Sequence, residues 1–219
     1  MDPVTMRQVA ELKMTPARPV IICDVDEVTL HFVRGFEQWL EEHELWLDPR
    51  SYHFEGNVRR RDDGEVIPTH QLKAHMQAFF KARIGSLEAI EGAAEVLAGL
   101  SSEAQVVMLT NLPHEYHETR RRNLAGHGMD YPLITNSGPK GPAVAAIAGR
   151  GNGDCVFVDD HADFLESAHE HHPRAELVHF LHDERFAPHA RQVPQARARV
   201  GHWQAAEAVI RQALDGEGR

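Results

Sequence analysis

The sequence predicts an α/β protein: a doubly wound, three-layer, Rossmann-like parallel sheet with a smaller, mainly helical cap inserted after the first strand. Short, continuous apolar runs typical of buried parallel strands recur along the chain. Helix-length segments separate most of these runs, which is the order of elements in a parallel sheet. About 80 residues lie between the first run and the second. That interval is too long for one crossover connection and predicts an insertion.

The first expected strand covers about residues 19–25 and leads into a pair of acids. Val20–Cys23 is apolar, and Asp24 and Asp26 follow it directly. Open α/β sheets place their chemistry at the carboxyl ends of strands. Because side chains alternate along a strand, the two carboxylates should point the same way. Like charges about 4 Å apart repel by roughly 4 kcal/mol at an effective dielectric near 20, so a cation or a shared proton is expected between them.

The domain organisation follows from the long interval after this strand. We expect a core domain made of residues 1–31 and 89–219, and an inserted cap domain made of residues 32–88. Within the cap, apolar residues at helical spacing predict one helix over about 32–46 and another over about 69–83. Two amphipathic helices of this kind can pack on each other.

The remaining elements are expected where apolar runs and turn signals alternate. Residues 1–17 should form a short, partly helical leader. Asp62-Asp63-Gly64 predicts a small hairpin within residues 50–68, because Asp-Gly favours a tight turn. The later elements are expected in the order helix 92–101, strand 106–109, helix 114–126, strand 132–135, helix 139–148, strand 155–158, a helix ending near 169, strand 176–181 and helix 203–214.

The bulk composition excludes some classes of function. Asp and Glu number 33 against 23 Lys and Arg, and the formal net charge of −10 argues against a protein that binds nucleic acid over its whole surface. No apolar run reaches the ~18 residues of a membrane span, and residues 1–19 lack the core of a signal peptide. We therefore expect a cytoplasmic protein, a monomer or homodimer, without membrane or nucleic-acid partners.

Cysteine and histidine usage gives no clear metal signal. Cys23 and Cys155 lie in apolar runs without C-x-x-C spacing, so they are expected to be buried and unpaired. The chain has 16 histidines. Those within residues 161–172 do not clearly show the i, i+4 pairing of a transition-metal site, and we interpret them as solvated.

Polar residues recur where successive expected strands end or a helix begins. Each of them alone is a weak signal, because Asp often follows an apolar strand and a single Lys near a helix start is usually solvated. Their order and their βα spacing are far more specific. The set is Asp24 and Asp26, then Thr110, then Lys140, then Asp159 with Asp160 and Asp163.

This arrangement resembles the haloacid dehalogenase-like hydrolase superfamily over about residues 19–181. The insertion also falls where that family carries its type-one cap. The matches to the four family motifs are Asp24-Val25-Asp26, Leu109-Thr110-Asn111, Lys140 and residues 158–163.

The resemblance implies a Mg²⁺-dependent phosphomonoester hydrolase of the phosphatase type, acting on a small phosphorylated metabolite. Asp24 would attack phosphorus and form an aspartyl-phosphate. Asp26 would protonate the leaving group and then activate water. Dehalogenating members lack an acid at this second position, so Asp26 favours phosphate chemistry over carbon–halogen cleavage.

The resemblance also implies the groups that bind metal and phosphate. Mg²⁺ would be held by the Asp24 carboxylate, the Asp26 backbone carbonyl and Asp159, which are the oxygen ligands that this ion prefers. The remaining implied groups are Asp163 or Asp160 in support of the metal, Thr110 and the Asn111 backbone on a phosphoryl oxygen, and Lys140 as a positive charge beside the phosphate.

Two features leave questions open. Glu27 stands where the family most often has Gly, and we expect its carboxylate to point toward the cap or to pair with a basic residue. The run Arg59-Arg60-Arg61 could reach a second anionic group on a substrate, although a solvated turn is the stronger interpretation. Two alternative functions also stay open: a phosphotransferase or phosphomutase that uses the same two acids, and a non-catalytic binding protein.

Overall fold

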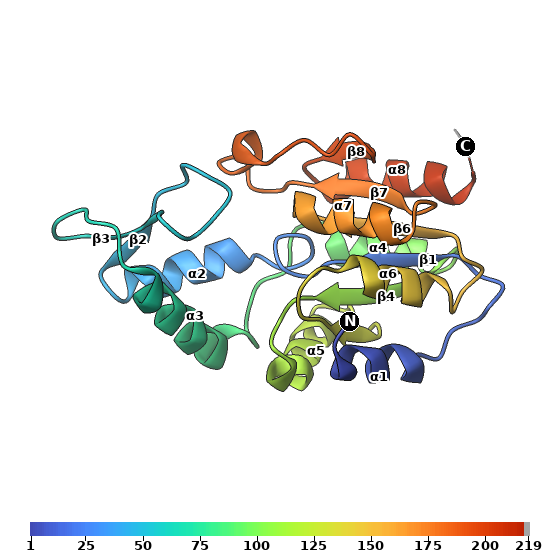
Figure 1. The fold of residues 1–219 in the computed structure, drawn as a ribbon, viewed down its shortest axis with the longest axis horizontal. Coiled ribbons are helices and arrows are strands. Elements are labelled where there is room, and N and C mark those ends of the chain that lie inside the picture. The colour runs from blue at the N-terminus through green and yellow to red at the C-terminus, as the bar shows by residue number, and fades with distance from the viewer. Residues whose placement is uncertain (217–219) are drawn as a thin grey trace.

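Six parallel strands form the central sheet in the computed structural model, which describes residues 1–216 (Figure 1). Their order across the sheet is β5-β4-β1-β6-β7-β8. The predicted fold class is confirmed. The strands are β1 (Val20–Cys23), β4 (Gln105–Thr110), β5 (Leu133–Thr135), β6 (Cys155–Asp159), β7 (Glu176–Phe180) and β8 (Ala196–Val200).

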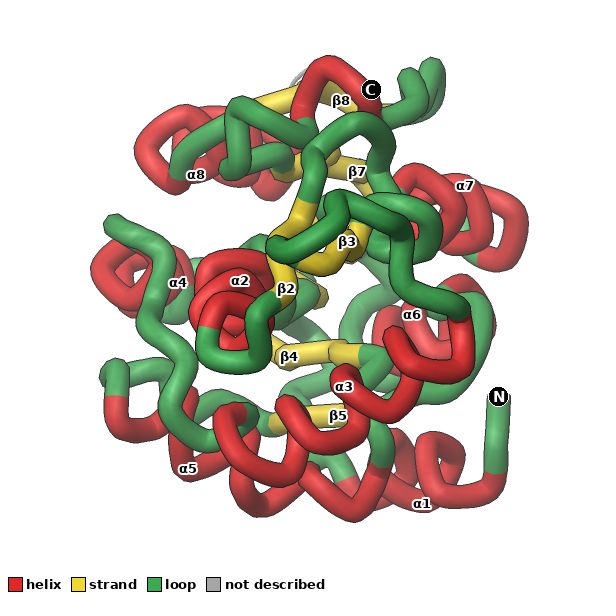
Figure 2. The backbone as a smooth tube through the Cα atoms, turned by 90° about the vertical axis from the view of Figure 1, so that its left-hand side faces the viewer, coloured by secondary structure: helices red, strands yellow, loops and turns green. Residues whose placement is uncertain are grey.

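Helices cover both faces of this sheet. The helices α1 (Pro3–Glu11), α6 (Gly141–Ala148) and α7 (Ala162–His171) lie on one side, and α4 (Ala93–Leu100), α5 (His117–Gly126) and α8 (Trp203–Leu214) lie on the other (Figure 2). Alternate side chains of β1 enter the cores on opposite faces of the sheet. Val20 and Ile22 pack in one core, and Ile21 and Cys23 pack in the other. A strand buried on both faces has to be apolar throughout, which explains the continuous run in the sequence.

The loop that follows β1 is fixed from the opposite end of the chain. Trp203, at the start of α8, is fully buried, and its indole N–H donates to the Val28 carbonyl at 2.8 Å. Within the loop, the Val25 carbonyl accepts from the N–H groups of Thr29 and Leu30, both at 2.9 Å. A buried indole needs a partner for its N–H, so this contact fixes the loop that carries the predicted catalytic acids.

The inserted segment lies beyond the carboxyl ends of the strands, at the left of Figure 1. Its two helices share an aromatic core, in which the ring of Phe79 lies 5.3 Å from that of Phe32 and 5.2 Å from that of Phe36. Buried aromatic pairs of this kind stabilise the packing of the two helices. The segment consists of α2 (Phe32–Glu41), β2 (Leu45–Leu47), β3 (Val58–Arg60) and α3 (Thr69–Arg83).

Three elements differ from the sequence predictions. The helix expected to reach residue 46 ends at Glu41, because Glu44 takes the left-handed conformation at φ 55° and the chain turns into β2. The expected hairpin around Asp62-Asp63-Gly64 forms, but it is short: Arg59 and Val66 make one antiparallel bridge across the turn, and β3 also pairs with β2. The strand β8 was not expected: it is an edge strand of alternating Ala and Arg, without an apolar run. Among residues 1–216, no helix has the length and apolar character to cross a membrane.

Candidate active site

A cavity of about 500 Å³ lies between the carboxyl end of the sheet and the inserted segment. Asp24 and Asp26 from the loop after β1 line it, together with Lys140 before α6 and Asp160 after β6. The parallel sheet brings these residues together, because all of its strands end at the same edge.

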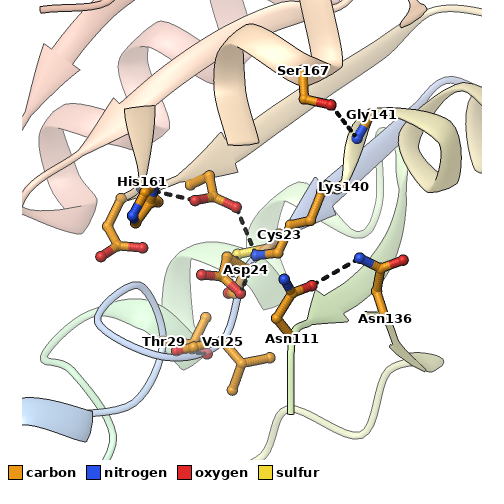
Figure 3. Close-up of polar contacts among 12 residues, drawn as sticks. Cys23, Asp24, Val25, Thr29, Asn111, Asn136, Lys140, Gly141, His161 and Ser167 are labelled. Carbon is orange, nitrogen blue, oxygen red and sulfur yellow. Dashed lines mark hydrogen bonds and ion pairs between the residues drawn. The ribbon is translucent and has the colours of Figure 1, made fainter. Parts of the chain in front are cut away.

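Lys140 lies between two buried carboxylates at the floor of this cavity (Figure 3). Its Nζ atom is 2.6 Å from Asp24 Oδ1 and 2.7 Å from Asp159 Oδ2, and all three side chains are almost fully buried. The Asp24 N–H donates to the Val158 carbonyl at 2.9 Å, so the backbone of β6 holds Asp24 in place. Removal of one member of such a buried cluster would leave another charge without its partner, so the three residues form one electrostatic unit.

Close contact between α6 and α7 positions Lys140. The Gly141 N–H donates to Ser167 Oγ at 3.2 Å, as Figure 3 shows. A Cβ atom at Gly141 would overlap the Ser167 backbone carbonyl, so only glycine allows this approach. Lys140 is the residue before the first turn of α6, so this contact helps to fix the backbone that carries its side chain.

Burial dominates the protonation of this cluster. It raises the pKa of Asp24 and of Asp159, and the nearby ammonium of Lys140 opposes that shift. For Lys140 itself, burial acts to lower the pKa, but the carboxylates of Asp159 and Asp24 outweigh it and raise the pKa above its usual value. The lysine is therefore charged at neutral pH.

Asp160 completes a group of three carboxylates that could hold a metal ion. Oxygen atoms of Asp24, Asp159 and Asp160 lie within 4.8 Å of one another. The Tyr52 hydroxyl, from the inserted segment, donates to Asp160 Oδ2 at 2.7 Å. Burial raises the pKa of Asp160 well above its usual range, and the charges of Asp159 and Asp24 add to the effect.

Asp163, predicted as an alternative support, does not join this group. It lies in the first turn of α7 with two thirds of its side chain exposed, and it pairs with Arg191. The difference is positional: Asp160 follows β6 directly at the sheet edge, whereas Asp163 is already part of the helix that leads away from it.

Asp26 points to a different cation. Arg120 of α5 is fully buried, and its Nη2 atom donates to Asp26 Oδ1 at 2.7 Å. Within the described chain, the Nε and Nη1 atoms of Arg120 have no hydrogen-bond partner. Burial raises the pKa of Asp26, and the Arg120 charge opposes that shift. A raised pKa suits a carboxyl group that has to carry a proton.

Thr110 and Asn111 differ in the groups that they leave free. The Thr110 Oγ1 atom is buried and has no hydrogen-bond partner among residues 1–216. The Asn111 side chain accepts from Asn136 Nδ2 at 2.8 Å and donates to the Gly138 carbonyl at 2.9 Å. Asn111 therefore holds the loop that leads to Lys140 (Figure 3). Thr110 is fully buried and is not among the residues that line the cavity.

Glu27 joins the core loop to the inserted segment. It has φ 60°, a left-handed conformation that explains why glycine suits this position. Its Oε1 atom accepts from the Val33 N–H at 2.6 Å, in the first turn of α2. Of the two expected orientations, this contact agrees with the one in which Glu27 points toward the inserted segment and not with pairing to a basic residue. Burial raises the pKa of Glu27 to about 8, and the charges of Asp183 and Asp26 add to the effect.

The run Arg59–Arg61 does not line the cavity. Its side chains pair with acids of the inserted segment, namely Asp48, Asp63 and Glu41. Arg59 and Arg60 lie in β3 and are half-exposed, so only Arg61 fits the interpretation as a solvated turn.

Comparison with known proteins identifies the fold. No model of a known protein family matches the sequence, and no curated protein does. A hydrolase of the haloacid dehalogenase family from Deinococcus radiodurans, solved with bound phosphate and sodium, matches with a TM-score of 0.60 at 19% identity, over 91% of this chain and 97% of that one. The chain has the haloacid dehalogenase-like fold.

Two further structures share this haloacid dehalogenase-like fold. A protein assigned as a hydrolase of the same type from Bacillus subtilis, bound to magnesium, has a TM-score of 0.59 at 12% identity, over 89% and 99% of the two chains. A predicted phosphoglycolate phosphatase from Haemophilus somnus has a TM-score of 0.53 at 11% identity, over 90% and 100%. The predicted resemblance is confirmed at the level of the fold, and the roles of individual residues stay predictions.

Three contacts of the site were missed from the sequence. Arg120 belongs to the run Arg120-Arg121-Arg122, and nothing in that run marks one arginine as buried. Tyr52 lies in a loop of the inserted segment, far from Asp160 in sequence. Asn136 follows the short strand β5, and a polar residue after a strand was the one available signal.

Proposed function

We propose that this chain is a Mg²⁺-dependent phosphomonoester hydrolase that acts through an aspartyl-phosphate on Asp24. The observation that carries the proposal is the buried unit of Asp24, Lys140 and Asp159 on the floor of a cavity that also contains Asp26. The parts are a carboxylate nucleophile, a fixed positive charge beside it and a second acid two residues away.

The donor set fits Mg²⁺. Asp24, Asp159, Asp160 and the Asp26 backbone carbonyl would hold the ion, and all of them offer oxygen. Three carboxylates share one ammonium here, so a divalent cation would balance the charge. When bound, the metal would neutralise charge on the phosphoryl oxygens.

The chain's own residues would divide the remaining tasks. Lys140 holds one Asp24 oxygen at 2.6 Å, which fixes the carboxylate and leaves its other oxygen for attack on phosphorus. Asp26 would give its proton to the leaving oxygen and take one from water in the second step. Arg120 fixes the orientation of Asp26, and the free Thr110 hydroxyl would donate to a phosphoryl oxygen.

The cavity lining favours an apolar leaving group without a second anion. Among the described residues that line it, Lys140 is the only lysine and there is no arginine. Three acids, Glu27, Glu55 and Asp183, also line it. A second phosphate or carboxylate on the substrate would meet these acids and no free cation. The aromatic lining residues that would contact the leaving group are Phe32, Phe54, Phe80, Phe164 and Phe186.

The test is phosphate release from a panel of phosphomonoesters, with Mg²⁺ and with a chelator. We expect Mg²⁺-dependent release, with kcat/KM higher for aryl or apolar alkyl phosphates than for bisphosphates of similar size. Product analysis separates hydrolysis from transfer: a phosphorylated acceptor without free phosphate would favour a phosphotransferase. No turnover of any monoester in folded, Mg²⁺-saturated protein would favour a binding protein.

A further inference from the structure

A second group of metal-ligating side chains lies where the two connections between the core and the inserted segment run side by side. The His31 N–H donates to the Glu88 carbonyl and the Ile90 N–H donates to the Thr29 carbonyl, both at 2.9 Å. His31 lies on the first connection and Glu91 follows the second. His182 comes from the loop after β7, so three distant segments meet at this point.

The ligand atoms of these three residues converge. One atom each from His31, Glu91 and His182 lies within 4.8 Å of the other two. The imidazole rings are 4.9 Å apart, and His31 Nε2 is 3.4 Å from Glu91 Oε2. In a tetrahedral zinc site with bonds of about 2.0–2.1 Å, neighbouring ligand atoms are roughly 3.3 Å apart, so modest inward movement would complete the site.

Two ring nitrogens in this group lack a hydrogen bond of normal geometry within the described residues. His31 is 3% exposed, and its buried Nε2 atom has only the long 3.4 Å contact with Glu91 Oε2. The Nδ1 atom of His182 is buried and unpaired in the same way within the described residues. Buried polar atoms are nearly always paired, since leaving one unpaired costs about 1–3 kcal/mol. A bound cation would satisfy both nitrogens at once.

We propose that His31, His182 and Glu91 bind a zinc-type divalent transition-metal ion, at a site separate from the Asp24 cluster. Two imidazole nitrogens with one carboxylate are a zinc-like donor set, whereas the Asp24 cluster offers only oxygen. His31 and His182 also line a second cavity of about 270 Å³, which leaves room for water as a fourth ligand.

The charged groups around the site permit a cation. Arg34 pairs with Glu88 at 3.2 Å, and Arg185 pairs with Glu37 and Asp183.

A metal here would tie both connections to the core. Because His31 and Glu91 flank the inserted segment in the chain and His182 lies in the core, in the loop after β7, a shared ion would restrict movement of that segment about its two connections. The ion would act on the geometry of the cavity without touching the reacting groups.

The test is a Zn²⁺ titration of the whole protein saturated with Mg²⁺, followed by calorimetry and by the absorption of Co²⁺ as a substitute. We expect one equivalent to bind and to raise the Tm. His182→Ala should weaken binding by about 100-fold or more, since even the loss of an outer partner of a ligand costs about 10–100-fold. Glu91→Gln should weaken it less, because a neutral amide oxygen can remain near the ion.

His70→Ala, which removes an exposed histidine from α3, is the matched control and should leave Zn²⁺ binding unchanged. The variants replace His182 and the exposed Glu91, because replacement of the buried His31 could unfold the chain. The proposal is wrong if Mg²⁺-saturated protein binds no Zn²⁺, or if His182→Ala binds it as tightly as the parent. It is equally wrong if Asp159→Asn, and not His182→Ala, removes the binding.

Discussion

Two acids that line the cavity, Asp24 and Asp26, pair with different cations, Lys140 and Arg120. We call the surroundings of these two pairs the Lys140 side and the Arg120 side. On the Lys140 side, Asp24 and Asp159 share a lysine that the packing of α6 on α7 fixes in place. On the Arg120 side, Asp26 meets an arginine from α5, on the opposite face of the sheet. Although the acids are two residues apart in sequence, each is paired directly with a different cation. In the proposed mechanism, Asp24 would make the nucleophilic attack and Asp26 would transfer the proton.

Asp24→Asn should have the largest effect on activity. It removes the proposed nucleophile, the Asp24 carboxylate, and keeps the shape of the side chain. We therefore expect kcat to fall roughly 10⁴–10⁶-fold with little change in fold. Phosphate release and circular dichroism measure the two quantities. Full activity in this folded variant would contradict the assignment of Asp24.

Lys140→Met should have the largest effect on stability. It leaves the Asp24 and Asp159 carboxylates buried without their cation, which should cost about 3–5 kcal/mol of unfolding free energy. Urea unfolding at neutral pH measures the loss. Lys73→Met, at an exposed position of α3, is the matched control. Equal stability of the two variants would show that Lys140 does not compensate the buried acids.

Arg120→Met tests the other side of the comparison. Because the Arg120 charge lowers the pKa of Asp26, its removal should raise that pKa further. The limb of the pH–rate profile that reports Asp26 should then move to higher pH, and kcat at neutral pH should fall about 10–100-fold. Arg121→Met, at the next position and half-exposed, should leave the profile unchanged. If this limb of the pH–rate profile does not move in Arg120→Met, Asp26 is not the catalytic acid.

The Lys140 side could be predicted from sequence and the Arg120 side could not. Asp24, Lys140 and Asp159 each adjoin an element with a strong local signal, and the parallel sheet brings strand ends to one edge. Arg120 lies mid-helix, and the sequence of α5 does not show which arginine faces inward. The inserted segment was predicted as helices, but its pairing of β2 with β3 depends on contacts between residues more than ten positions apart.

Tyr52→Phe should moderately weaken Mg²⁺ binding, because Tyr52 of the inserted segment contacts Asp160. The Tyr52 hydrogen bond lowers the pKa of Asp160 against the larger effect of burial, so its loss should raise that pKa. Metal binding by Asp160 would then require higher pH, and the Mg²⁺ concentration for half-maximal activity should rise about 3–10-fold, as for one lost hydrogen bond. Tyr131→Phe serves as the control, because Tyr131 does not line the cavity.

Glu27→Gln should change the pH dependence of stability. The folded pKa of Glu27, about 8, lies above the ordinary value of 4.5, because burial disfavours the charged form. The folded chain therefore binds the proton more tightly than the unfolded chain, and the free energy of unfolding should decrease as pH rises from about 4.5 to 8.

Glutamine keeps an oxygen for the Val33 N–H but cannot ionise, so the variant should lose this part of the decrease and gain stability relative to the parent at pH 8. Urea unfolding at pH 5 and pH 8, without added metal, measures both chains, with the exposed Glu184→Gln as control. Parallel pH dependence in the parent and Glu27→Gln would mean that this carboxylate stays solvated. The contact of the core loop with α2 would then be independent of charge.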